Sequence, residues 1–87
     1  MEVHVAIEDS IRTDARMLDR AEGVLVALRR CTIDAAFDEI VGASKRHGVP
    51  ALRIARALVA LAENSSLGGD PDATAAARHE WGSLFES

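Results

Sequence analysis

Hydrophobic positions recur along most of this chain at the spacing of amphipathic helices. From Ile11 to about Arg30 the apolar residues follow a helical period, and Asp9 or Ser10 can cap the start of that helix. Ahead of it, residues 1–8 alternate apolar and polar side chains, which is typical of a short strand. The pattern therefore predicts a strand-like segment followed by a long first helix.

Local signals divide the next part of the chain into two further helices. Thr32 is a good N-cap for a second helix, and Gly48 suits the position just after its end. Pro50 is expected to open a third helix at its first position. The expected apolar faces are Ala36, Phe37, Ile40, Val41 and Ser44 in the second helix, and Ala51, Ile54, Ala55, Leu58, Leu61 and Ala62 in the third.

The last third of the chain reads as a linker and a fourth helix. Residues 64–69 are polar or glycine except for Leu67, and Asp70-Pro71 has the form of a cap followed by a first helical residue. Over residues 73–85 the apolar side chains share one face: Ala77, Trp81, Leu84 and Phe85. We expect this helix to pack back on the others, because Trp81 and Phe85 would otherwise be exposed.

These elements predict an all-α fold, a three-helix bundle with a long first helix and a short C-terminal fourth helix. At 87 residues the chain is one small domain. We divide it into an N-terminal segment 1–9, a three-helix domain 10–63, and a linker and amphipathic tail 64–87.

The first helix carries a short heptad pattern. Ile11, Leu18 and Leu25 lie seven residues apart at a positions, and Ala21 and Leu28 occupy d positions. These five residues are the candidate seam of a homodimer. In mid-helix, Gly23 indicates either close helix packing or the close approach of a ligand.

Charge is unevenly distributed, although the net charge is −4. Residues 10–62 hold nine Lys and Arg against six Asp and Glu, while both ends are acidic. This mildly basic centre permits an anionic partner. The chain has no long apolar run and no signal-peptide pattern, so we expect no membrane span and a cytoplasmic location.

No residue pattern predicts catalysis. His4, His47 and His79 lack the spacing of metal ligands, and the single Cys31 cannot build a cysteine-rich zinc site. We expect no enzyme activity, no cofactor and no metal. The basic side chains are the better candidates, because Arg29, Arg30, Lys45 and Arg46 close helices, and Arg53 and Arg56 lie near the start of the third.

Three blocks in order give the chain a family resemblance. They are Arg20-Ala21-Glu22-Gly23-Val24-Leu25, then Cys31-Thr32-Ile33-Asp34-Ala35-Ala36-Phe37, then Ser44 and residues 52–59 around Ala55. This set resembles the ANTAR family, the RNA-binding antiterminator output domains of bacterial regulators. The resemblance implies a three-helix unit that dimerises through its first helix and binds paired stem-loops of a nascent leader RNA, preventing a terminator hairpin.

The resemblance makes seven residues candidates for RNA binding: Gly23, Arg29, Arg30, Lys45, Arg46, Arg53 and Arg56. The chain departs from the family pattern where Glu22 replaces the usual Lys, where Val41-Gly42 replaces an Arg in the second helix, and where Val49-Pro50 replaces Arg-Lys. Only about nine residues precede the first helix, so we expect any regulation to come from a separate partner.

Two other functions are compatible with the same residues. The inverted charge at Glu22 and the tail with Trp81 favour a protein-interaction module that forms homodimers or mixed dimers. The second and third helices could instead form a helix-turn-helix DNA binder, with Arg53 and Arg56 facing a groove. Structured RNA remains the favoured partner.

Overall fold

The computed structural model describes the backbone of residues 2–65 and 70–86, and the side chains of residues 14–65 and 70–86. This part of the chain is helical, without strands, which confirms the all-α prediction. The α-helices are α1 (Glu2–Arg29), α2 (Ile33–His47), α3 (Ala51–Ala62) and α4 (Pro71–Trp81), and a 3₁₀ turn, η1 (Gly82–Phe85), follows.

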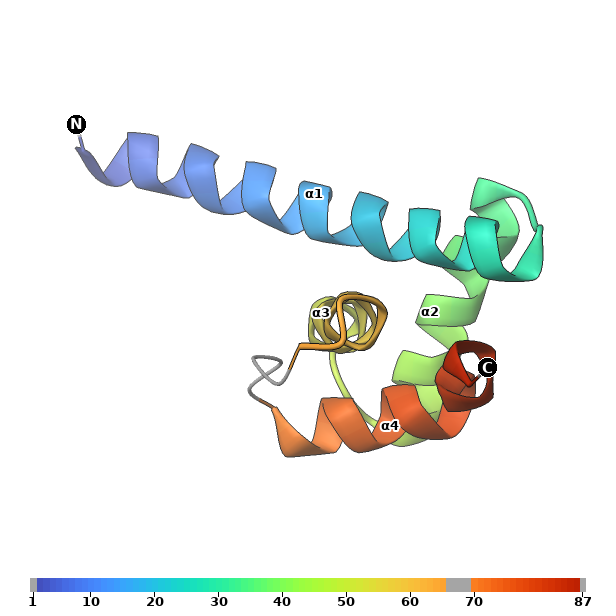
Figure 1. The fold of residues 1–87 in the computed structure, drawn as a ribbon. Coiled ribbons are helices and arrows are strands. Elements are labelled where there is room, and N and C mark those ends of the chain that lie inside the picture. Colours follow the sequence, from blue (N-terminus) through green and yellow to red (C-terminus); the bar gives the residue numbers. More distant parts are fainter. Residues whose placement is uncertain (1, 66–69, 87) are drawn as a thin grey trace.

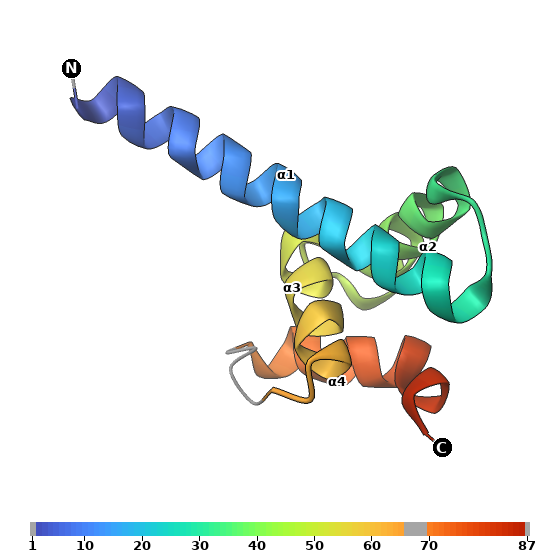
Figure 2. The same ribbon diagram turned by 45° about the horizontal axis from the view of Figure 1, so that its top comes forward.

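Helix α1 is longer than the sequence pattern predicted. It begins at Glu2, so the predicted strand over residues 1–8 is wrong, and Asp9 and Ser10 lie inside the helix rather than at its cap. A lone strand has no pairing partner, whereas extending a helix adds one backbone hydrogen bond per residue. The N-terminal part of α1 projects beyond the other helices and stretches the molecule to 48 × 28 × 24 Å (Figures 1 and 2).

The local signals around α2 are confirmed. The Thr32 hydroxyl oxygen accepts a hydrogen bond from the Ala35 backbone N–H at 3.1 Å. Gly48 has a φ of 64°, the left-handed conformation that ends a helix, and its N–H donates to the Ser44 carbonyl. Pro50 lies one residue earlier than predicted, at the N-cap of α3. The short turn between α2 and α3 is thus fixed by backbone chemistry.

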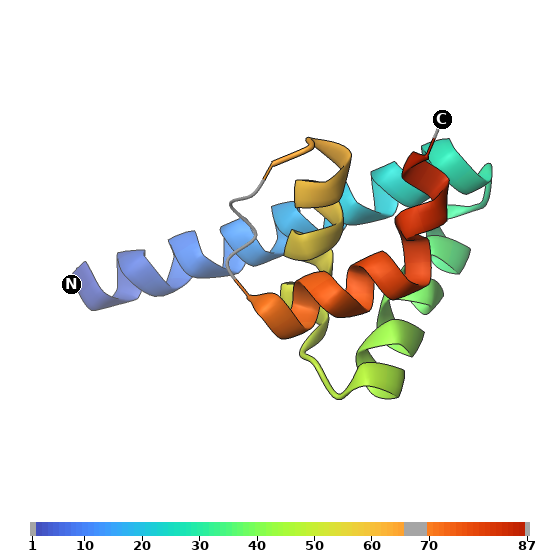
Figure 3. The same cartoon turned by 60° about the horizontal axis from the view of Figure 1, so that its bottom comes forward.

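Helix α3 is the centre of the molecule. It runs between α1 and α4 and crosses both (Figures 1 and 3). Five of its twelve residues are buried: Ile54, Ala55, Ala57, Leu58 and Val59. Two alanines among these five let neighbouring backbones approach closely. The buried set is wider than predicted, since it includes Ala57 and Val59, while Leu61 is half-buried and Ala62 is exposed.

Helix α4 packs back on the bundle, as predicted. Asp70 caps it by accepting from the N–H groups of Asp72 and Ala73, and Pro71 is its first residue. Trp81 is 1% exposed, and its indole N–H donates to Glu39 at 3.0 Å. The tail therefore shares one hydrophobic core with the first three helices.

Phe37 is not part of that core. The prediction that it lies on the buried face of α2 is wrong, because the line facing α3 is Ala36, Ile40 and Ala43. Phe37 lies one position to the side and is 44% exposed. Leu28 and Ile33 are also large exposed apolar residues, at the end of α1 and the start of α2.

Trp81 and Phe37, one buried and one exposed, make a direct test of this packing. Trp81→Ala should lower the free energy of unfolding by about 3–5 kcal/mol, since it leaves a cavity and removes the partner of Glu39. Phe37→Ala should cost about 1 kcal/mol or less, because nearly half of the side chain is already in water. Urea unfolding followed by circular dichroism measures both, and equal losses would contradict the placement of α4.

Candidate nucleic-acid interface

The basic candidates lie in three pairs on three helices. Arg29 and Arg30 end α1, Lys45 and Arg46 lie in the last turn of α2, and Arg53 and Arg56 lie on one face of α3. All six side chains are exposed. In the described part of the chain, their ion pairs are with acidic residues of other helices or loops.

Three of the six arginine and lysine candidates already hold acidic partners. Arg29 pairs with Glu39 at 2.9 Å. Arg46 donates to both carboxylate oxygens of Glu80, at 2.6 and 3.0 Å. Arg53 lies 3.3 Å from Asp70. An RNA phosphate would have to displace a carboxylate to bind these three arginines.

Glu80 is the most strongly perturbed of these acids. The hydrogen bond from Arg46, followed by one from His47, lowers the pKa of Glu80 to about 2, against the opposing effect of burial. The same hydrogen bond raises the pKa of Arg46. Gly42 makes room for this contact, because a Cβ there would lie only 3.1 Å from the Arg46 guanidinium. Gly42 therefore lies directly beside the Arg46–Glu80 ion pair.

The other three candidates, Arg30, Lys45 and Arg56, form no ion pair with any residue that the structure describes. Arg30 is also conformationally unusual, with a φ of 55°. A left-handed conformation costs a residue with a side chain about 1–2 kcal/mol, so an arginine at this position lowers the stability of the fold relative to glycine. These three side chains are free to meet an anion.

Gly23 has a different environment from the one predicted. It is exposed on α1, and a Cβ added there would meet nothing within 4 Å. Within the described chain it does not mediate close helix packing, so that prediction is wrong. The open space is compatible with the approach of a ligand, which stays a prediction.

The predicted dimer seam overlaps the core of a single chain. Ala21 and Leu25 are 0% exposed and belong to the intramolecular hydrophobic cluster, and Leu18 packs against it. A second copy could not reach Ala21 or Leu25, because the heptad pattern matches the face that α1 turns toward α3. Leu28 remains accessible at 41% exposure, and Ile11 lies outside the residues whose side chains are described.

Glu22 adds negative charge close to the core. It is 8% exposed, and burial, followed by the charges of Asp19 and Asp34, raises the pKa of its carboxyl group. The position where the family usually carries a lysine therefore holds an acid that the fold itself disfavours in its charged form.

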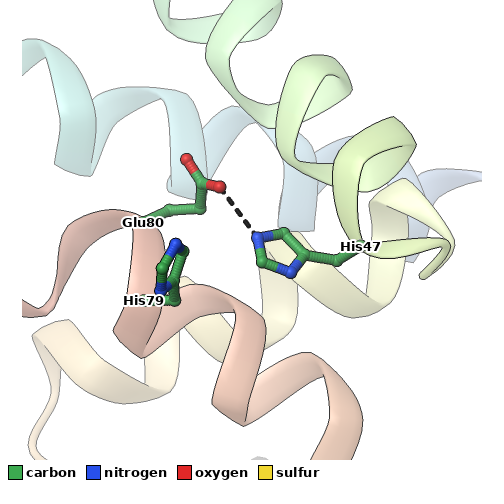
Figure 4. Close-up of side chains that lie close together, drawn as sticks. All are labelled: His47, His79 and Glu80. Atoms are coloured by element: carbon green, nitrogen blue, oxygen red, sulfur yellow. Dashed lines mark hydrogen bonds and ion pairs between the residues drawn. The ribbon is translucent and has the colours of Figure 1, made fainter.

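A histidine cluster lies at the contact between α2 and α4, and the sequence did not predict it. His47 Nε2 lies 2.8 Å from Glu80 Oε2, and the rings of His47 and His79 meet edge to face at 5.4 Å (Figure 4). Residues 32 positions apart carry no spacing signal, so only the packing of α4 could bring them together. The sequence analysis expected no metal here from the spacing of the histidines, and the structure adds that His47 and His79 nevertheless lie side by side.

These features define a small all-helical domain with arginines and lysines at its helix ends, a class suited to binding an anionic partner. The ANTAR domain family model matches residues 12–59, just over half of the chain, and the chain belongs to the ANTAR family. This is a family of regulatory RNA-binding antiterminator output domains and not of catalysts. No curated protein and no solved structure matches the chain.

The bounds of the family match divide the basic residues of the site from two of their acidic partners. The match includes all six basic candidates, whereas Asp70 and Glu80 lie beyond its end, in the tail. Two arginines of the RNA-binding unit are therefore paired by acids from outside it. Among the helices that the structure describes, none is long and apolar enough to cross a membrane.

Glu22 gives a prediction on pH. A raised pKa means that the folded state favours the protonated carboxyl, so its contribution to stability is complete below the ordinary value of 4.5 and is lost as pH rises through the folded pKa. Glu22→Gln mimics the protonated form. It should raise the free energy of unfolding at pH 7, and the gain should shrink toward zero at pH 4.

Urea unfolding at both pH values measures this difference. Glu86→Gln, at an exposed acid near the chain end, is the matched control and should change stability little at either pH. A Glu22→Gln variant that is less stable than the wild type at pH 7 would contradict the account of Glu22.

Proposed function

We propose that this protein is a cytoplasmic RNA-binding regulator of the antiterminator type, acting on hairpins of a nascent leader RNA. The family match over residues 12–59 carries the proposal. The position of the basic side chains supports it, because eight exposed arginines and lysines of the described chain, the six candidates together with Arg16 and Arg20, fall inside the matched segment. Their role would be to neutralise phosphates and so hold the hairpins in place.

Arg30, Lys45 and Arg56 are the primary contacts in this proposal. They need not give up an acidic partner, so their charge is available to a phosphate at no electrostatic cost within the chain. Arg29, Arg46 and Arg53 contribute less, since each would exchange a carboxylate for a phosphate. The buried Trp81 offers no surface for base stacking, and Phe37 is the exposed aromatic side chain of the described residues, so in this proposal shape and phosphates carry most of the recognition.

A substitution at Arg30 can distinguish a role in RNA binding from a role in stability, because the two effects have opposite signs. Glycine is the residue that the left-handed conformation favours, so Arg30→Gly should raise the free energy of unfolding by up to about 1 kcal/mol. The same change should weaken binding to paired-hairpin RNA and reduce the slope of log K against log salt by about 0.7–0.9. Urea unfolding and filter binding at several salt concentrations measure the two effects.

The matched control is Arg78→Ala, which removes the same charge from an exposed position on α4, outside the family match. It should leave RNA affinity close to that of the wild type. If Arg30→Gly binds as well as the wild type, or if Arg78→Ala weakens binding equally, the proposed contact surface is wrong.

A protein-interaction module is the second candidate function, and the exposed apolar residues favour it. Ile33 and Phe37 lie one turn apart on α2, at 53% and 44% exposure, and Leu28, in the last turn of α1, is 41% exposed. We propose that a second copy of the chain covers these three residues. In this dimer the accessible Leu28, Ile33 and Phe37 form the contact, in place of the buried Ala21 and Leu25 of the predicted seam.

Sedimentation equilibrium tests this dimer. The wild type should dimerise and Phe37→Ser should be mainly monomeric, whereas Asp38→Ser, at the exposed neighbouring position, should behave as the wild type. A wild type that stays monomeric at high concentration would refute it. The helix-turn-helix alternative is disfavoured, because α3 packs against every other helix and exposes only Arg53, Arg56 and Ala62.

A further inference from the structure

Two helix ends converge on one small group of side chains. His47 is the last residue of α2, and His79 and Glu80 lie in the last turn of α4. One ligand atom from each of the three lies within 4.8 Å of the other two. Figure 4 shows the carboxylate and the two imidazole rings gathered at the contact between the helices.

We propose that His47, His79 and Glu80 bind one divalent transition-metal ion of the zinc type, which bridges α2 to α4. Two imidazole nitrogens and one carboxylate oxygen are a ligand set that Zn²⁺ accepts, with a fourth position left to water. The partial negative charge at the C-terminal ends of both helices also favours a cation there.

The required movement is small. Metal–ligand bonds of about 2.1 Å in a tetrahedral site place the ligand atoms about 3.4 Å apart. His47 Nε2 and Glu80 Oε2 are closer than this, at 2.8 Å, and must separate slightly to admit the ion. His79 is exposed, so its ring can turn inward without disturbing the core.

Arg46 is the competitor for the carboxylate. Its guanidinium holds Glu80 at 2.6 Å, but the Arg46 side chain is 58% exposed and can return to water at low cost. An ion on Glu80 Oε2 displaces the 3.0 Å hydrogen bond from Arg46 Nε and leaves the guanidinium with a single bond, to Oε1, so Arg46 exchanges more readily to another anion. This consequence rests on the proposed function, because a free Arg46 would add a contact to RNA phosphate.

Metal binding is tested without RNA. Chelator-treated full-length protein is titrated with ZnCl₂ by calorimetry, and the unfolding temperature is measured with and without Zn²⁺. The wild type should bind one ion per chain and gain thermal stability. His79→Ala should weaken binding at least about tenfold, while circular dichroism shows an unchanged fold.

His4→Ala removes the third histidine of the chain and is the matched control, which should bind as the wild type does. The site is refuted if the wild type binds no Zn²⁺, if His79→Ala binds equally well, or if the stoichiometry is one ion per two chains.

The release of Arg46 has a separate readout. Zn²⁺ should raise the affinity of the wild type for paired-hairpin RNA a few-fold and leave that of Arg46→Ala unchanged. Zinc binding with no change in RNA affinity would refute the release and leave the site standing. Absence of RNA binding under all conditions would refute the proposed function and leave the metal site standing.

Discussion

The fold depends on the burial of α3. This helix has apolar or small side chains around most of its circumference, and α1 and α2 alone cannot cover it. Helix α4 supplies the missing cover, with three alanines and Trp81 buried at the contact. In a chain of 87 residues, where little apolar surface can be buried at all, this cover is a large part of the stability.

The same packing sets the electrostatics of the family unit. By docking on α3, the tail brings Asp70 to Arg53 and Glu80 to Arg46. Its Trp81 also shares Glu39 with Arg29, since both donate to the same carboxylate oxygen. The tail, which lies outside the ANTAR match, thereby neutralises Arg46 and Arg53 inside it, whereas the candidates Arg30, Lys45 and Arg56 form no ion pair with any described residue.

The sequence predicts correctly those helix ends that depend on contacts between residues close together in the chain. Thr32, Gly48 and Asp70 each act through backbone groups within five residues, so their types and positions were sufficient to place helix ends. Helical period identified the helices, and the ordered blocks identified the family.

Sequence reasoning failed where the outcome depends on how one helix is rotated against another. A period of 3.6 cannot tell whether Phe37 or Ala36 faces α3, or whether Ala21 and Leu25 face a second copy or the chain's own core. The ion pairs of Asp70 with Arg53 and of Glu80 with Arg46 and His47 join residues 17 to 34 positions apart, and local spacing does not indicate them.

We propose that this ANTAR domain still binds structured RNA, despite Glu22 and the paired arginines. The most direct measurement is filter binding of the full-length protein to paired-hairpin RNA and to duplex DNA of the same sequence, each at low and at physiological salt. The account predicts tight binding to the hairpin RNA that weakens steeply with salt, and much weaker binding to the duplex. No binding to hairpin RNA at low salt would contradict it.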